Sequence, residues 1–297
     1  MPVNSLRHYL LLMAMATIWS SSFAVIKVGL ETLPPATLAA GRIVLAALLL
    51  YGFMRFRGGR LPPLGPVWGT YFAVGLFGNG LPFLLINWGE QLIDSGLAAI
   101  LMAVMPLATL ILTHFYTTDE RMSLPKVLGV LAGFSGVAVL MGADALAGMS
   151  GHVLAQVAVA GGAVCYAVAT TMARHLPHRP TEERSAAVML ASMVLIVPAS
   201  LIMDQPWALD PSADSVAACI YLGLFPTALA TILYFILISE RGATFISFNN
   251  YIIPVLGVLW GVLFLDEVLT VRSVLALLLV LSGIFLATYR SRGWQKT

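Results

Sequence analysis

Apolar residues run along this chain in long, almost unbroken stretches that short polar segments separate. A helix needs about 20 apolar residues to cross the core of a bilayer, and nearly every stretch is that long. The stretches lack the period-two alternation of membrane β-strands, so helices must satisfy their backbone groups. The pattern predicts ten membrane-spanning helices at 9–30, 36–54, 67–88, 95–117, 125–143, 153–173, 186–203, 216–238, 243–265 and 271–289.

The positive charges are distributed unevenly between these expected helices. When the polar gaps are numbered alternately, thirteen of the sixteen Lys and Arg fall on one side, and Arg272 alone falls on the other. Cytoplasmic loops of membrane proteins collect Lys and Arg, so both termini are expected in the cytoplasm. The absence of targeting segments and extra domains favours a bacterial source, and hence a multi-pass protein of the inner membrane.

The second half of the chain repeats features of the first half at a nearly constant offset. Ser135-Gly136 matches Ser282-Gly283 and Asp119-Glu120 matches Asp266-Glu267, both at 147 residues. We therefore expect an all-α fold of two five-helix repeats, 1–145 and 150–290, followed by a cytoplasmic tail, 291–297. Because five is odd, the second repeat must be inverted in the membrane, which is a recurring design of secondary transporters.

Composition supports a membrane protein and excludes several classes. Apolar residues make up 59% of the chain and charged residues 10%, whereas a soluble protein has about 25% charged residues. The Lys and Arg form no continuous basic face, so no nucleic-acid partner is expected. The chain has no Gly-rich phosphate loop and no metal-ligand spacing, so no cofactor and no metal are expected. The expected partners are the lipid bilayer and a small-molecule substrate, and no particular oligomer is indicated.

The residues that carry a family resemblance are Trp19-Ser-Ser-Ser-Phe23, Lys27, Pro34-Pro35, Arg42, Asp119-Glu120 to Gly136, and Asp266-Glu267 to Gly283. In these positions, and in ten spans with both ends inside, the chain resembles the drug/metabolite transporter superfamily of EamA type. Within this superfamily the chain resembles the YddG-type exporters of aromatic amino acids. The resemblance covers the whole chain and implies export of small metabolites through a central cavity formed mainly by spans 1, 3, 4, 6, 8 and 9.

Two cations lie inside expected spans. An ionised group in the membrane costs several kcal/mol unless it is paired, hydrated or near the interface. Lys27 and Arg42 both lie in the outer half of their spans, where snorkelling relieves part of this cost. A structural interpretation has Lys27 reach Glu31 or helix-end carbonyls and Arg42 tie span two to a neighbour. A functional interpretation has one of them attract a substrate carboxylate.

Polar and aromatic residues near the span centres are candidates for substrate contact. Buried amides need hydrogen-bond partners, which neighbouring helices or a substrate can supply. Flexible Met side chains and flat aromatic rings suit a pocket for varied apolar ligands, although helix packing and the interfacial aromatic belt also use them. The predicted substrate-binding residues are Trp19, Asn79, Met102, Tyr166, Tyr234, Asn249 and Asn250.

Four prolines fall inside expected spans, in corresponding places of the two halves: Pro82, Pro106, Pro226 and Pro254. Proline removes a backbone donor and bends a helix. We therefore expect hinges or unwound points beside the cavity, with static kinks as the alternative interpretation.

The pattern as a whole favours a secondary transporter over an enzyme. The prediction is export of small amphipathic metabolites, with aromatic or apolar amino acids as the leading class, by alternating access. Drugs or sugars are alternative cargo, and a membrane enzyme acting on lipid-linked substrates or a sensory scaffold are the rival classes. The carboxylates are expected in loops or at span ends, which favours facilitated transport or exchange. If protons are coupled, Glu90, Glu240, Glu31 or His114 must carry them.

Overall fold

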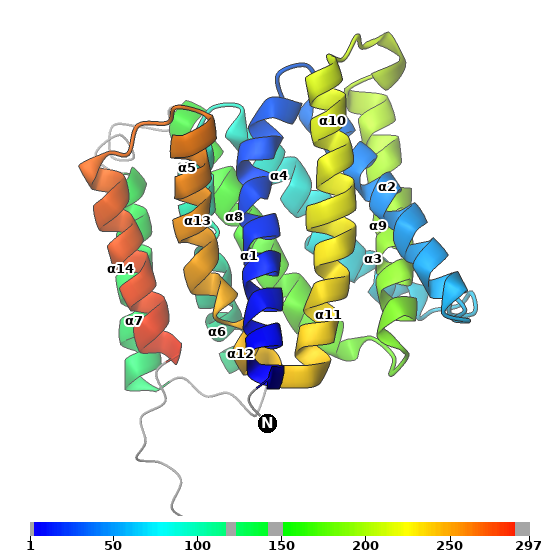
Figure 1. Ribbon diagram of the computed structural model, residues 1–297, viewed down its shortest axis with the longest axis horizontal. Coiled ribbons are helices and arrows are strands. Elements are labelled where there is room, and N and C mark those ends of the chain that lie inside the picture. The colour runs from blue at the N-terminus through cyan, green and yellow to red at the C-terminus, as the bar shows by residue number, and fades with distance from the viewer. Residues whose placement is uncertain (1–2, 117–122, 142–150, 289–297) are drawn as a thin grey trace, which may run out of the picture.

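The computed structural model describes residues 3–116, 123–141 and 151–288, so that Asp119-Glu120 and the tail 291–297 lie outside the described residues. Within these ranges the protein is a bundle of helices without strands (Figure 1). The first half contains α1 (Val3–Gly29), α2 (Pro35–Phe56), α3 (Trp68–Gly75), η1 (Leu76–Gly80), α4 (Leu81–Glu90), α5 (Ser95–Leu101), α6 (Val104–Tyr116) and α7 (Leu124–Met141). The second contains α8 (Gly151–Met172), η3 (Ala173–His175), α9 (Thr181–Met203), η4 (Pro206–Ala208), α10 (Ala213–Leu222), η5 (Gly223–Leu229), α11 (Ala230–Arg241), α12 (Ala243–Ile246), α13 (Asn249–Phe264) and α14 (Val271–Thr288).

The all-helical membrane fold predicted from the hydropathy pattern is confirmed. Nine continuous helical stretches among the described residues are long and apolar enough to cross a bilayer, and α13 is a shorter apolar helix. The helix α13 in the ninth expected span, 243–265, is short because Ser247 and Phe248 separate α12 from α13. The first residues of α1 and the last residues of α14 lie at the same end of the bundle (Figure 1).

Irregular backbone lies at, or up to two turns before, each of the four prolines. Proline has no N–H to donate to the carbonyl four residues earlier, and its ring collides with that carbonyl. For Pro106 and Pro254 these carbonyls belong to Met102 and Asn250, which lie where α5 gives way to α6 and where α13 begins. Pro226 lies inside η5, and Pro82 is the second residue of α4, which follows η1. The turns that proline weakens are therefore the places where these spans depart from α-helical geometry.

The two π-helical segments begin at the same position of each half. The segment η1 starts at Leu76 and η5 starts at Gly223, which is 147 residues later. This is the offset that relates the two Ser-Gly and the two Asp-Glu pairs. A π turn contains one extra residue and is frequent at functional sites. Both halves therefore carry a widened turn in the middle of their third span.

Glycines allow α7 and α14 to cross closely at one edge of the bundle (Figure 1). A side-chain carbon added to Gly283 would lie 2.5 Å from the amide nitrogen of Gly133 and 2.6 Å from the carbonyl oxygen of Gly129. Such close backbone approach is typical of small-residue contacts between membrane helices.

The fourth and ninth spans meet at one end only. Helix α13 packs extensively against α5 and barely against α6, although α5 and α6 belong to the same span. Gly257 on α13 faces Ala99 on α5 so closely that the two backbones have no room for another side chain. The charge distribution predicts this end, which contains Asp94 and Glu267, to be external. The two spans are therefore joined toward the predicted outer face and diverge toward the inner one.

Candidate functional site

The serines of α1 give this helix a polar side in the middle of the bundle. Ser20, Ser21 and Ser22 each donate to the carbonyl three residues earlier, over 3.0, 2.9 and 2.5 Å. Such back-bonding satisfies a hydroxyl without a partner from another helix. The Ser20 hydroxyl also accepts from Trp260 Nε1 on α13 over 2.9 Å, and Ser21 bonds to the Tyr221 hydroxyl on α10 over 2.9 Å. The serines therefore join α1 to α13 and α10 of the second half.

Next to the serines, Trp19 and Tyr234 form an aromatic pair between α1 and α11. Their ring centroids are 6.1 Å apart, and Trp19 Nε1 donates to the carbonyl of Pro226 in η5 over 3.0 Å. Both rings are partly buried against one apolar cluster, which we call the α1–α11 cluster: Leu12, Met15, Ala230, Leu237, Phe245 and Ile246. The structure thus brings three of the predicted residues, Trp19, Pro226 and Tyr234, into one place.

Asn249 begins α13 beside this cluster. Its side chain is 2% exposed, and neither the Oδ1 nor the Nδ2 atom has a hydrogen-bond partner among the described residues. Ile252, three residues after Asn249 on α13, packs against the α1–α11 cluster, to which Ile246 at the end of α12 also belongs. Residues three apart share one side of a helix, so Asn249 lies on the side of α13 that Ile252 presents to this cluster. The neighbouring Asn250 is partly exposed and points about 100° away.

The remaining predicted contacts lie elsewhere in the bundle. Met102 and Tyr166 are partly buried against the largest apolar cluster, to which α1, α4, α5, α6 and α8 contribute. Asn79 in η1 donates from Nδ2 to the Ser192 hydroxyl on α9 over 3.0 Å. Its amide therefore joins two helices, as the alternative interpretation of buried asparagines expects.

The two cations inside the spans have different surroundings. Arg42 is 4% exposed, and its Nε and Nη2 atoms donate to the Thr227 hydroxyl in η5 over 3.2 and 3.1 Å. Its guanidinium carbon also lies 3.9 Å from the centroid of the Phe83 ring, which is a cation–π contact. Lys27 is partly buried and makes no hydrogen bond or ion pair with the described part of the chain. Arg42 therefore joins span two to span eight, as its structural interpretation expects. Lys27 does not make the contact with Glu31 or helix-end carbonyls that its structural interpretation expects among the described residues.

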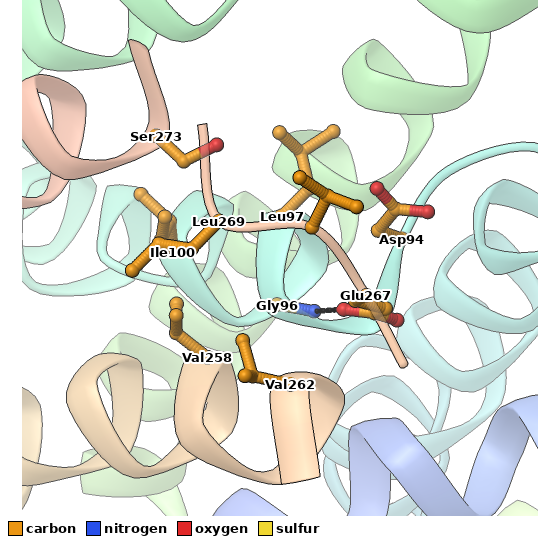
Figure 2. Close-up of a pocket in the computed structure, with 10 residues that line it drawn as sticks. Asp94, Gly96, Leu97, Ile100, Val258, Val262, Glu267, Leu269 and Ser273 are labelled. Carbon is orange, nitrogen blue, oxygen red and sulfur yellow. Dashed lines mark hydrogen bonds between the residues drawn. The ribbon is translucent and has the colours of Figure 1, made fainter. Parts of the chain in front are cut away.

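A polar cluster closes the end where α5 and α13 meet. Figure 2 shows Glu267 reaching the first turn of α5, where its carboxylate accepts from the backbone N–H of Ser95 over 2.6 Å and of Gly96 over 2.9 Å. Carboxylates stabilise the free N–H groups and the positive dipole of a helix N-terminus. Asp94 and Ser273 line the small pocket beside this contact. Glu267 therefore holds α5 against the end of α13.

Glu90 is the residue whose surroundings the sequence pattern did not indicate. It is the last residue of α4, at a span end, where an exposed side chain would be expected. The structure buries it completely, with an exposed fraction of 0%, and both carboxylate oxygens lack a partner among the described residues. Hydropathy marks the end of a span but does not show which neighbours cover it.

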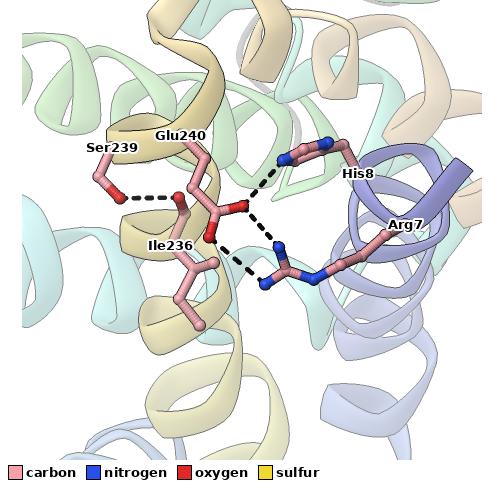
Figure 3. Close-up of polar contacts among 5 residues, drawn as sticks. All are labelled: Arg7, His8, Ile236, Ser239 and Glu240. Carbon is pink, nitrogen blue, oxygen red and sulfur yellow. Dashed lines mark hydrogen bonds and ion pairs between the residues drawn. The ribbon is translucent and has the colours of Figure 1, made fainter. Parts of the chain in front are cut away.

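The opposite end of the bundle has an ion pair between α1 and α11 (Figure 3). The Arg7 guanidinium donates to Glu240 over 2.9 and 3.4 Å, and His8 Nε2 lies 2.8 Å from the same carboxylate. Ion pairs in contact with water contribute about 0–1 kcal/mol to stability, so this pair is a weak contact between α1 and α11.

The described residues contain no group of three or more His, Cys, Asp or Glu that could hold a metal ion.

Comparisons with known proteins agree with this architecture. The model of the EamA-like transporter family matches residues 6–142 and again 153–289. The inner membrane transporter YedA of Escherichia coli strain K12 is 28% identical over 281 residues, which cover 93% of this chain and 89% of YedA. A probable terminal-alkyne amino-acid exporter of Streptantibioticus cattleyicolor is 26% identical over 286 residues, 94% of this chain and 92% of the exporter.

A solved structure extends the likeness to three dimensions. The chain superposes on a protein crystal structure with a TM-score of 0.68 and 22% sequence identity, covering 95% of this chain and 97% of the other. At this identity the likeness concerns the fold alone. Together with the family model, which matches nearly the whole chain, these findings show that the protein belongs to the EamA-like transporter family and is a multi-pass transporter of the inner membrane.

Proposed function

We propose that the protein exports small amphipathic metabolites, with aromatic or apolar amino acids as the leading class, by alternating access. The observation that carries the proposal is the buried amide of Asn249, which has no partner among the described residues and lies on the side of α13 toward the cluster that also holds the Trp19–Tyr234 pair. A buried polar group without a partner costs about 1–3 kcal/mol, and a ligand that bonds to it recovers this cost. The relative named as an amino-acid exporter supports the same class of cargo.

The chemistry of this place suits a molecule with one flat apolar end and one polar end. The aromatic pair offers a surface for stacking, and the Asn249 amide both donates and accepts hydrogen bonds, as an α-amino acid does. Met102, Tyr166 and Asn250 are the further contacts in this proposal. Asn79 already donates one hydrogen bond to Ser192, so less of its amide is available to a substrate and it is a weaker candidate.

The proposed movement uses the irregular turns near the four prolines. Inverted halves can exchange conformations, so that the end that is joined in one state separates in the other. In this proposal the breaks at Met102–Ala103 and Ser247–Phe248 let the outer and inner parts of spans four and nine tilt separately.

Exchange of labelled solute in liposomes tests the substrate class. Purified protein is reconstituted into liposomes loaded with one unlabelled solute, and uptake of labelled phenylalanine from outside is followed. We expect phenylalanine, tryptophan and leucine inside to drive uptake, and glutamate and glucose to drive none. Exchange of labelled glucose or of a labelled drug by protein that does not exchange labelled phenylalanine would contradict the amino-acid assignment.

Replacement of Asn249 tests the site. We expect Asn249→Ala to raise the concentration for half-maximal exchange about tenfold, which corresponds to the loss of one hydrogen bond of about 1.4 kcal/mol. Gln91→Ala is the matched control because this amide is exposed at the outer end. Equal affinity of Asn249→Ala and Gln91→Ala would remove Asn249 from the site. Tolerance of cells to a toxic phenylalanine analogue, with and without the protein, tests the direction of transport.

A further inference from the structure

Glu90 is buried in a place that gives its carboxylate no hydrogen bond. Both oxygens lack a partner among the described residues, and the side chain has no exposed surface. An ionised carboxylate in such surroundings is costly, whereas the protonated acid is much cheaper to bury. The free energy of the closed outer end therefore depends strongly on whether Glu90 carries a proton.

Three charged groups surround Glu90 without pairing with it. Lys27 on α1 and Arg42 on α2 act on it as cations, and Glu267, in the segment after α13, acts as an anion. The Arg42 donors are directed to Thr227, and the Glu267 carboxylate is occupied by the N-terminus of α5. The cations attract the Glu90 anion through space, but neither supplies a hydrogen bond.

Further titratable groups lie on the elements packed against α4. On α8, His152 Nδ1 is bonded to the carbonyl of Leu92 over 2.8 Å, and Tyr166 lies near Arg42. Asp94, in the turn between α4 and α5, is exposed and lines the pocket beside Glu267 (Figure 2). None of these groups is hydrogen-bonded to Glu90, so they serve as controls for any effect of pH.

We propose that Glu90 is a proton-binding site that controls the outer end of the transporter. With the proton bound, the acid is neutral and α4 remains packed against its neighbours while α5 stays closed on α13. When the proton leaves for the external solution, the anion gains water and hydrogen-bond donors only if the outer end opens. The step needs no reactant other than the proton, which Glu90 takes up again before the end closes.

This proton site goes beyond the proposed cargo and does not depend on it. The distribution of carboxylates in the sequence favours transport without an ionisable relay, because each acid is placed in a loop or at a span end. The burial of Glu90 supplies such a group next to the contact between spans four and nine. Opening of the outer end can be measured without any solute. A negative result for the proton site therefore leaves the proposed substrate class unaffected, and the reverse is also true.

A buried cysteine at the closed end reports on opening. Ser95 is fully buried, its hydroxyl has no partner among the described residues, and cysteine has nearly the same size. The reporter is Ser95→Cys in full-length protein that also carries Cys165→Ala and Cys219→Ala. A membrane-impermeant maleimide is applied to the outer face in proteoliposomes. Gln91→Cys, an exposed position, is labelled in parallel, and the ratio of the two rates corrects for the effect of pH on the thiol itself.

The expected result is a ratio that rises with pH. Linkage to one proton allows at most about a tenfold rise per pH unit, and we expect a several-fold rise between about pH 5 and pH 9. Glu90→Gln imitates the neutral acid and is expected to keep the ratio low at every pH. Glu31→Gln, an exposed carboxylate near the same face, and His152→Gln are expected to behave like the parent.

Three outcomes would overturn the proposal. The first is a flat ratio in the parent protein, and the second is an unchanged rise in Glu90→Gln. The third is loss of the rise in His152→Gln alone. If Glu90→Gln does not fold, as judged by size-exclusion chromatography, Glu90→Asp replaces it. This variant keeps a titratable group and is expected to shift the midpoint of the rise, so an unchanged midpoint would also overturn the proposal.

Discussion

Buried polar side chains in this protein fall into two groups, those with partners and those without. Arg42 and Asn79 have partners on other helices, so their desolvation is offset and they act as ties within the bundle. Asn249 and Glu90 are more completely buried than the half-buried Asn79, and they have no partner among the described residues. Sequence analysis could identify Asn79 and Asn249 only as the same kind of residue, because partners come from helices distant in the chain. The difference between them is a property of tertiary structure.

At the residue scale, Thr227 is predicted to stabilise the buried position of the Arg42 side chain. Its hydroxyl accepts both donors of the guanidinium, so Thr227→Val leaves a buried cation with its ring contact alone. We expect a loss of about 1–3 kcal/mol in the free energy of unfolding, measured in detergent. Thr170→Val is the control, since Thr170 is exposed and bonds only to its own helix. Equal stability of the two variants would contradict this role of Thr227.

At the scale of the elements, the departures from regular helices coincide in the two halves. The π segments begin at equivalent positions, and the breaks in spans four and nine lie about one and two turns before a proline. The prolines could be recognised in the sequence, and the irregular turns follow from their missing donors. The π turns could not be recognised, because nothing in Leu76–Gly80 or Gly223–Leu229 distinguishes an extra residue from an ordinary one.

The crossing of α7 and α14 is predicted to depend on Gly283. An added methyl group would meet the backbone of α7, which cannot move aside as a side chain can. We expect Gly283→Ala to lower the free energy of unfolding by about 1–3 kcal/mol. Gly52→Ala is the matched control in α2, where nothing lies near the added atom, and it is expected to be neutral or stabilising by up to about 1 kcal/mol. A stable Gly283→Ala would show that the two helices can separate at no cost.

At the scale of the whole molecule, the sequence was sufficient for the fold class and insufficient for the site. Long apolar stretches predict membrane helices because a bilayer imposes their length, and the structure contains these helices where they are expected. The contact of α13 with α5, and its separation from α6, depend on how small residues such as Gly257 and Ala99 meet across the bundle. Each residue alone is consistent with any helix contact.

A larger side chain at Gly257 is predicted to force the outer end apart. Its first carbon would overlap Ala99 Cβ, so Gly257→Leu cannot form the closed contact. We expect faster labelling of the Ser95→Cys reporter from outside, with a smaller effect of pH than in the parent. Gly69→Leu, where nothing lies near the added carbon, serves as the comparison. Unchanged labelling in Gly257→Leu would mean that the contact between α5 and α13 does not close this end.

The π turn in span three also determines which way the rest of that span is rotated. One residue corresponds to about 100° of helix rotation, so the extra residue in Leu76–Gly80 sets the angular phase of every side chain from Leu81 to Glu90. Deleting Gly78 would turn that stretch by about 100° if the regular helix re-formed, and Glu90 would leave its enclosed position. A single inserted residue in the middle of span three therefore sets the direction of an acidic side chain at the outer end of the span, about three helical turns away.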